Sequence, residues 1–292
     1  MKITCHSDYG KLKRVFIKRP EAAFINDFKI SNEWQQLNFL SKPDLAQSIL
    51  EFNQLEKLLL ASGTQVDYLP IDETVTLDSV YCRDASIATD FGMILCNMGK
   101  AARIPEPAAS AKAFENANVK ILGEIKLPGT VEGGDVAWVD EHTLAVGHTY
   151  RTNKQGIAQL KALLQPHGVS VWVAELPHYK GPADVFHLMS VFSPVDKNLA
   201  VVYSPLMPIS FRNGLLDKGY SLIEVPDDEW DSMGCNVLAI APREVIVVKG
   251  NPVTAQRLTE AGCIVHQYEG TEISVKGGGG PTCLTRPVER IL

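Results

Sequence analysis

The sequence predicts an α/β fold in which five similar units, each a hairpin followed by a helix and a strand, close into a ring. Three observations predict this fold. Pairs of short apolar segments joined by turn residues recur along the chain. Each pair is followed by one helix-like and one strand-like segment. The pairs also recur at a nearly constant spacing of about 50 residues, which is typical of propellers and repeat arrays.

Four units are complete within the central part of the chain. Hairpins are expected over residues 79–96, 133–149, 186–204 and 235–250, where alternating apolar residues flank turn signals. The helices that follow are expected from Pro107 onward and over 153–168, 208–218 and 252–262. The closing strands are expected over 118–125, 169–177, 220–226 and 263–269.

The fifth unit is divided between the two ends of the chain. The segment "CLTRPVERIL", from Cys283 to the end, is long enough for one strand only. The N-terminal region supplies the missing parts: a strand over 13–20, a helix over 44–63 and a strand over 65–70. We therefore expect the N- and C-terminal segments to close the ring, which leaves no exposed sheet edge. Residues 1–292 are expected to form one domain.

Composition and charge exclude several classes of protein. The chain has 292 residues, of which 45% are hydrophobic and 21% charged, as in an ordinary globular protein. Its net charge of −6, with scattered basic residues, argues against a nucleic-acid partner. The sequence shows neither a signal-peptide pattern nor an apolar run long enough for a membrane span. The six cysteines form no C-x-x-C pair, so we expect reduced thiols in a cytoplasmic protein, and no metal site. Oligomeric state is left open, a homodimer included.

One position of the repeat carries polar residues in every unit. The residues at the start of the first strand are separated by 51, 52, 49 and 47 positions, and they are Asp84, Asp135, His187, Asn236 and Cys283. If rotation relates the units, these side chains face one common axis. A packed centre should be apolar, whereas this set comprises two acids, an imidazole, an amide and a thiol. The sequence therefore predicts a functional site on the axis.

A run of glycines precedes the last of these residues. In "KGGGGPTCLTRP" (276–287), four glycines lead through a proline to Cys283. An isolated cysteine is more often a small hydrophobic residue of the core than a nucleophile. Glycines, however, let the backbone approach a ligand and present its N–H groups. Gly279 and Gly280 are therefore expected to support the site around Cys283.

Five segments in order resemble the guanidino-group modifying enzymes, the superfamily of arginine deiminase, dimethylarginine dimethylaminohydrolase and the amidinotransferases. These segments are "DSVYCRDAS" (78–86), "VEGGDVAW" (131–138), "GHTYRTNKQGI" (147–157), "FHLMSVF" (186–192) and "GGGGPTCLTRP" (277–287). The resemblance runs from about residue 12 to the end and is nearest in motif to the dimethylarginine hydrolases. It implies a five-bladed, pseudo-symmetric α/β propeller, in agreement with the repeat count.

The resemblance also implies residue roles. Cys283 matches the nucleophile and His187 the acid–base residue. Asp84 and Glu132 match acids that hold the substrate guanidinium, whose N–H groups suit carboxylates. Asp135 is expected to support the loop that carries Glu132.

Three further residues match positions that hold the rest of the substrate. Arg103 and Arg151 match arginines that clamp an α-carboxylate, and Asp78 matches an acid near the α-amino group. They imply a small guanidino substrate that is an α-amino acid, such as arginine or an N-methylated arginine. Arg83 departs from the dimethylarginine hydrolases, which carry an acid there, and matches the deiminases.

The implied reaction is C–N hydrolysis of a linear amidine through a cysteine-bound thiouronium, giving citrulline and ammonia or an alkylamine. It requires no metal or organic cofactor. Two alternatives remain: an amidinotransferase, and a non-catalytic binding propeller. The transferases carry aspartate where this chain has Glu132, which favours hydrolysis. Retention of the acids, His187 and Cys283 argues against the non-catalytic reading.

Overall fold

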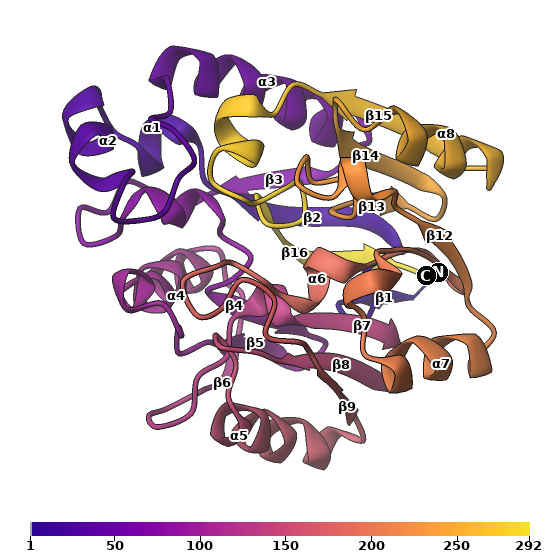
Figure 1. The fold of residues 1–292 in the computed structure, drawn as a ribbon. Helices are drawn as coiled ribbons and strands as arrows, with labels where there is room; N and C mark the ends of the chain where they lie inside the picture. The colour runs from indigo at the N-terminus through magenta and orange to yellow at the C-terminus, as the bar shows by residue number, and fades with distance from the viewer. Residues whose placement is uncertain (1) are drawn as a thin grey trace.

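The structure, a computed structural model, describes residues 2–292 as five small sheets with helices around them (Figure 1). In each of the four central sheets, the first strand runs antiparallel to the second, and the second pairs in parallel with the third. The first two are β4 (Ser86–Thr89), β5 (Gly92–Leu95), β6 (Ile121–Glu124) and β7 (Val136–Asp140), β8 (Thr143–His148), β9 (Ser170–Glu175). The next two are β10 (Phe192–Asp196), β11 (Leu199–Val202), β12 (Ser221–Glu224) and β13 (Leu238–Ala241), β14 (Glu244–Val248), β15 (Ile264–Tyr268).

A helix links the second and third strands of each central sheet, because two parallel neighbours need a crossover connection. These helices are α4 (Glu106–Asn116), α5 (Lys154–Leu164), α7 (Ile209–Asp217) and α8 (Pro252–Glu260). Local sequence sets the start of α5, where the Asn153 side chain accepts a hydrogen bond from the Gly156 N–H. The predicted order of hairpin, helix and strand is confirmed in all four units.

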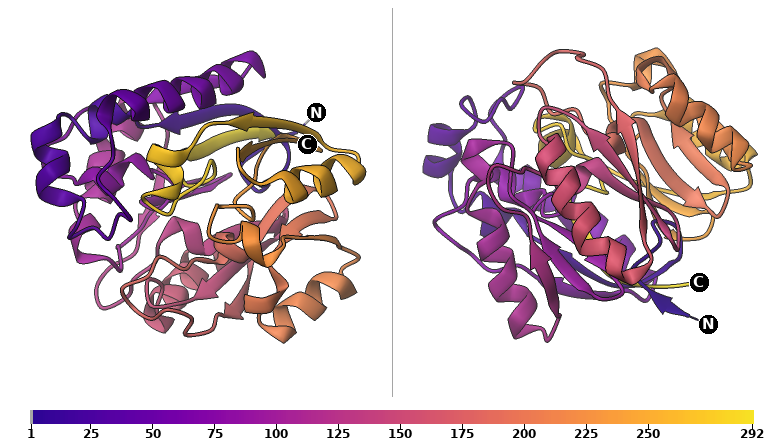
Figure 2. Two further views of the ribbon diagram at one scale, coloured as in Figure 1. Left: turned by 45° about the horizontal axis from the view of Figure 1, so that its top comes forward. Right: turned by 90° about the horizontal axis from the view of Figure 1, so that it is seen from below.

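The fifth sheet joins the two ends of the chain, as predicted. Its strand order is β1 (Ile3–Thr4), β16 (Thr285–Ile291), β2 (Lys11–Ile17) and β3 (Gln65–Tyr68). The helix α3 (Leu45–Ala61) crosses from β2 to β3. The termini lie side by side, where the N–H of Lys2 donates to the carbonyl of Leu292 (Figures 1 and 2).

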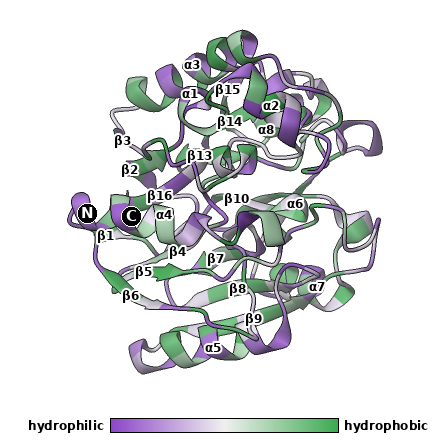
Figure 3. Cartoon of the chain, turned by 90° about the vertical axis from the view of Figure 1, so that its left-hand side faces the viewer, coloured by the Kyte–Doolittle hydropathy of each residue, from purple (hydrophilic) through white to green (hydrophobic). Residues whose placement is uncertain are grey.

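The five sheets succeed one another around a common centre. The inner strands β7 and β10 are in contact, as are β10 and β13, β13 and β2, and β16 and β4. The first and second sheets share an apolar core that includes Ile87 and Val136. Figure 3 shows the strands as mainly hydrophobic, whereas polar residues concentrate on the outer helices and loops. Each sheet remains a separate, open sheet.

Three short helices were not anticipated from the sequence. The helices α1 (Pro20–Ala23) and α2 (Asp27–Glu33) fill the connection before α3. The helix α6 (Leu188–Val191) replaces the start of the hairpin expected from residue 186, so that β10 begins at Phe192. Within residues 2–292, no helix combines the length and the apolar composition that crossing a bilayer requires.

Candidate active site

The structure brings four of the five repeat-position residues to one cavity. Each of the five lies at most five residues before an inner strand of its sheet, namely β4, β7, β10, β13 or β16. Asp84, His187, Asn236 and Cys283 line a cavity of about 350 Å³, whereas Asp135 lies behind it. The polar side chains therefore converge because the sheets start around a shared centre.

Cys283 is half-buried at the bottom of this cavity. The Nδ2 of Asn236 donates to its Sγ over 3.3 Å, and the Oγ1 of Thr282 lies 3.8 Å from the same sulfur. Burial raises the pKa of the Cys283 thiol, the negative charge of Asp84 raises it further, and the two hydrogen bonds act in the opposite direction. The thiol is therefore mainly protonated at neutral pH in the free protein.

The glycine run lets the chain pass very close to Tyr81. A Cβ on Gly277 would lie 1.9 Å from the Tyr81 Oη, and one on Gly279 would lie 2.5 Å from the ring. Gly278 has φ +75°, a left-handed conformation that other residues adopt only with strain. The hydroxyl of Tyr81 donates to the carbonyl of Ile273 over 3.0 Å. The run is thus required for packing of the loop before Cys283.

Gly280 permits a second contact that holds this loop. A Cβ there would lie 2.5 Å from the Asn236 Oδ1. That oxygen accepts hydrogen bonds from the Thr282 N–H (3.0 Å) and from its Oγ1 (2.8 Å). Asn236, which the sequence placed at the repeat position without a definite role, therefore bonds both the nucleophile candidate and the residue before it.

His187 lies between two carboxylates. Its Nε2 is 2.9 Å from the Oε2 of Glu132, and its Nδ1 is 3.9 Å from the Oδ1 of Asp84. Burial alone would lower the pKa of His187, but the negative charges of Asp135, Asp84 and Glu132 outweigh it and raise the pKa to about 9. The imidazole is therefore protonated at neutral pH. Its position requires Gly134, because a Cβ there would lie 2.4 Å from Nδ1.

Glu132 lies behind His187 and does not line the cavity, with 0% of its surface exposed. Its carboxylate accepts hydrogen bonds from the N–H of Lys100 (3.0 Å) and from Nη1 of Arg151 (3.3 Å). The bond to His187 and the positive charge of Arg151 outweigh burial and lower the pKa of Glu132. The expectation that Glu132 faces the substrate guanidinium therefore differs from what the structure shows, since His187 and Arg151 cover it.

Asp135 ties the second sheet to the segment that carries His187. Its Oδ1 accepts a hydrogen bond from the Leu188 N–H (3.0 Å), and its Oδ2 accepts one from the Thr149 hydroxyl (2.7 Å). Burial raises the pKa of Asp135 to about 6, although the neighbouring His187 lowers it. The expected support is thus directed at His187 as well as at the loop of Glu132.

Arg103 is engaged with acids of the protein itself. Its Nη1 donates to Asp84, and its Nε (2.9 Å) and Nη2 (2.8 Å) donate to the two oxygens of Glu106. The side chain lines the cavity but is only 3% exposed, and in this structure it holds Asp84 in place. Glu106 was not expected from the sequence; its spacing of three residues from Arg103 at the start of a predicted helix was the available signal.

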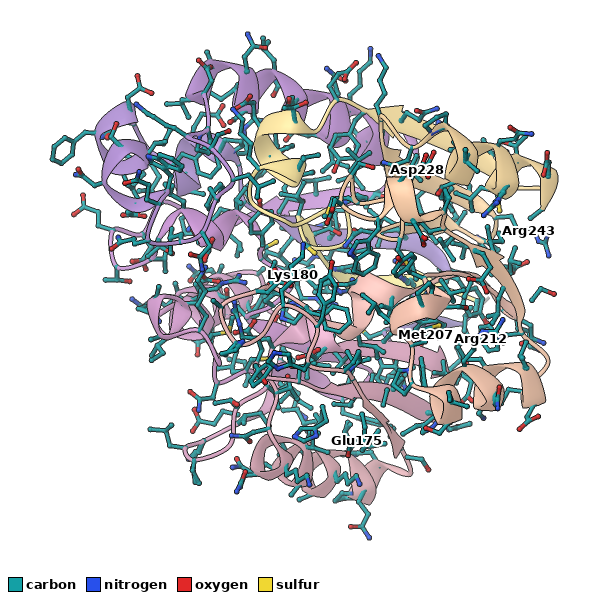
Figure 4. The ribbon with its side chains drawn as sticks, in the orientation of Figure 1. Glu175, Lys180, Met207, Arg212, Asp228 and Arg243 are labelled. Atoms are coloured by element: carbon teal, nitrogen blue, oxygen red, sulfur yellow. The ribbon has the colours of Figure 1, made fainter. Side chains whose placement is uncertain are left out.

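Arg151, Asp78 and Lys100 line the same cavity. Arg151 pairs with Glu132, as described above. The Oδ2 of Asp78 accepts a hydrogen bond from Nζ of Lys100 over 2.6 Å, and the same ammonium donates to the carbonyl of Leu37 over 2.8 Å. Lys100 carried no distinctive sequence signal. Lys180, labelled near the centre of Figure 4, also lines the cavity, whereas Glu175 and Arg243 lie toward the outside.

The site is built to receive a cation. One carboxylate oxygen, Asp84 Oδ1, is buried without a hydrogen-bond partner. Ligand atoms of Asp84, Glu132 and His187 lie within 4.8 Å of one another, a grouping that could hold a metal ion. Because Arg103 and Arg151 already pair with the two acids, a planar monovalent cation suits this group better than a divalent metal.

Comparison with known proteins identifies the family. The family profile described as N,N dimethylarginine dimethylhydrolase, eukaryotic, matches residues 14–290. The chain is 28% identical over 289 residues to the uncharacterised protein YkgA of Bacillus subtilis, covering 99% of this chain and 96% of that one. It is 26% identical over 273 residues to the N(G),N(G)-dimethylarginine dimethylaminohydrolase of Pseudomonas aeruginosa, covering 94% and 98%.

Solved structures show the same fold. The dimethylarginine dimethylaminohydrolase of Pseudomonas aeruginosa in complex with citrulline superposes with a TM-score of 0.78 at 23% identity, covering 95% of this chain and 99% of that one. SxtG, an amidinotransferase of Microseira wollei, superposes with a TM-score of 0.79 at 17% identity, covering 97% and 96%. The chain therefore belongs to the N,N-dimethylarginine dimethylhydrolase family, within the superfamily of enzymes that modify guanidino groups.

Proposed function

We propose that this protein hydrolyses the guanidinium group of arginine or of an N-methylated arginine through a cysteine-bound thiouronium intermediate. The observation that carries the proposal is one cavity lined by a thiol, a protonated imidazole and the unpartnered carboxylate oxygen of Asp84. The family match supports hydrolysis of a guanidino group.

The first half-reaction breaks a C–N bond. The guanidinium donates hydrogen bonds to Asp84, and its positive charge replaces the solvation that burial removes from the Cys283 sulfur. The thiol then releases its proton to solvent, and the thiolate attacks the guanidinium carbon. The imidazolium of His187 protonates the departing nitrogen as its bond to carbon breaks. The product amine leaves, and a planar thiouronium remains on Cys283.

The second half-reaction uses the same residues in reverse. The neutral imidazole of His187 removes a proton from water, and the resulting hydroxide attacks the thiouronium carbon. The C–S bond breaks, the thiolate of Cys283 is released, and the new C–OH group loses its proton to solvent to give the ureido product. Glu132 bonds to the Nε2 of His187, so it orients the ring and stabilises its protonated form in each cycle.

The remaining cavity residues suit an α-amino acid. Asp78 supplies negative charge for a substrate ammonium, and Lys100 and Arg151 supply positive charge for a carboxylate; without substrate, Asp78 pairs with Lys100 and Arg151 with Glu132. Arg103 fixes the carboxylate of Asp84 at the guanidinium end. We further infer that the five units form one pseudo-symmetric propeller domain, because their inner strands succeed one another and present the same sequence position to the cavity.

A single incubation tests hydrolysis against transfer. Arginine or N-methylated arginine, supplied with excess glycine, is expected to give citrulline together with one equivalent of ammonia or alkylamine. The reason is that Glu132 keeps His187 positioned to activate water. Mass spectrometry of the products distinguishes hydrolysis from transfer of the amidino group. Ornithine and guanidinoacetate without citrulline would establish the amidinotransferase alternative, and agmatine serves as the control that lacks the α-carboxylate.

The pH dependence of kcat/KM should show a limb on the alkaline side. The imidazole of His187 has its pKa raised to about 9, so the acid needed for amine departure is present at pH 7 and is lost as pH rises through that value. The free energy of unfolding should also fall as pH rises. The His187 ion pairs contribute fully to stability below the ordinary histidine pKa of 6.5, and this contribution is lost as pH rises through about 9. Steady-state kinetics between pH 6 and 10 measure the alkaline limb of kcat/KM, and thermal unfolding over the same range measures the change in stability. An alkaline limb near 6.5 would contradict the assignment.

A further inference from the structure

A second charged cluster is buried beside the start of β4 and does not line the cavity. Three arginines and one aspartate form it: Arg83 (2% exposed), Arg286 (5%), Arg290 (1%) and Asp8 (6%). Asp84 lines the cavity, whereas its neighbour Arg83 does not and instead pairs with Asp8. We call these four residues the axial arginine cluster.

The cluster is held by segments from four sheets. The Asp8 carboxylate accepts Nη2 of Arg83 (2.6 Å) and the Trp138 N–H on β7 (2.7 Å). Nη1 of Arg286 donates to the carbonyl of Ser86 on β4 over 2.6 Å. Nη1 of Arg290 donates to the carbonyl of Ala239 on β13 over 2.8 Å. Both of these arginines belong to β16.

Most of the guanidinium N–H groups in the cluster are not used. Five buried nitrogens have no hydrogen-bond partner within residues 2–292: Nε and Nη1 of Arg83, Nε of Arg286, and Nε and Nη2 of Arg290. The carbonyls that accept the other bonds carry no net charge. Three cations thus face a single carboxylate, which leaves two positive charges uncompensated within the cluster.

Such an excess is unfavourable in a protein interior unless a counter-charge is present. The arginines are close enough to affect one another. Burial lowers the pKa of Arg286 to about 9, and the charge of Arg83 adds to this effect. Burial likewise lowers the pKa of Arg290 to about 10, where Arg83 again acts in the same direction and Asp8 opposes it. The cluster is therefore one electrostatic unit that lacks negative charge.

We propose that the axial arginine cluster binds a small monovalent inorganic anion of the halide class. The unused N–H groups of all three arginines supply the donors, and the excess positive charge supplies the attraction. The four side chains are at most 6% exposed, and none lines the 350 Å³ cavity, so the cluster is separate from the substrate site and only a small ion suits it. This inference is independent of the proposed function.

Bromide diffraction and chloride-dependent stability test the site on the full chain. Crystals grown in sodium bromide should show one anomalous peak among the three guanidinium groups. In solution, the protein is dialysed into gluconate buffer, and chloride is added at constant ionic strength. The thermal midpoint is expected to rise with chloride and to keep rising with the logarithm of its concentration above the Kd, because only the folded state holds the site. Density that fits water alone, with a midpoint independent of chloride, would overturn the proposal.

Two variants and a control separate the site from general salt effects. Arg290→Met removes two of the unused donors and should abolish the chloride response, whereas Arg243→Met removes an exposed arginine and should retain it. Asp8→Asn removes the single carboxylate of the axial arginine cluster. It should lower the Kd for chloride, because the positive charge of the cluster increases. An unchanged response in Arg290→Met, or a weaker one in Asp8→Asn, would contradict the assignment. If Arg290→Met does not fold, the bromide peak in the unmodified protein decides.

Discussion

Cys283→Ser is expected to abolish turnover and leave the fold intact. The serine hydroxyl occupies less space than the thiol and can still accept from the Asn236 Nδ2, so the loop contacts persist. It cannot form an alkoxide at neutral pH, because no general base contacts this position among the described residues. We expect a loss of at least about 10³-fold in kcat, as for other covalent nucleophiles. Steady-state assays and circular dichroism measure the two effects.

A matched control uses the other half-buried cysteine. Cys5 lies at the termini, where its Sγ donates to the carbonyl of Val288 over 2.6 Å, and burial raises the pKa of its thiol to about 12. Cys5→Ser should retain full activity. A haloacetamidine, which carries the planar cation that Asp84 would bind, should label Cys283 and spare Cys5. Equal labelling of both, or an active Cys283→Ser variant, would refute the nucleophile.

His187→Ala and Asp84→Asn are expected to impair the enzyme in different ways. His187 transfers protons to and from the reacting groups, so its loss should lower kcat by about 10²–10⁴-fold with a smaller change in KM. Asp84 attracts the guanidinium in the ground state and the transition state alike. Its neutral isostere can still accept from Arg103 but lacks the charge, and KM should therefore rise more than kcat falls.

Kinetic constants across the full substrate range test this division. Alanine at position 84 would remove the acceptor of the buried Arg103 Nη1 while Glu106 still pairs with the rest of the guanidinium, which is why asparagine is the better substitution. Thermal unfolding of both variants controls for loss of structure. An unchanged KM in Asp84→Asn together with a raised KM in His187→Ala would reverse the two roles.

Part of the site could be predicted because it depends on local sequence. Each hairpin is specified by its alternating residues and its turn, and each crossover helix by its apolar face, with a side-chain cap at α3 and α5, so the repeat is visible without long-range information. The regular spacing then aligned Asp84, His187, Asn236 and Cys283. The glycine run also indicated close approach, although the structure shows that the approach is to Tyr81 and Asn236.

The sequence did not predict which way neighbouring side chains point. Arg83 and Asp84 are adjacent, yet one pairs with Asp8 in the axial arginine cluster and the other lines the cavity. Their partners come from segments 75 and 19 residues away, so no local pattern distinguishes the two directions. The prediction placed Arg103 on the substrate, whereas Glu106 and Asp84 already occupy its guanidinium.

The sequence by itself determined the five hairpin-helix-strand units, the joining of the two chain ends in one sheet, and the repeat position shared by Asp84, His187, Asn236 and Cys283, because each follows from short-range hydrophobic patterns and their repetition. Only the tertiary structure decided which acids face the cavity and which support His187. Ion pairing among buried groups depends on desolvation and on charges brought together from different sheets. Glu132 shows the reason: His187 and Arg151, from the third and second units, cover it and hold it ionised behind the site.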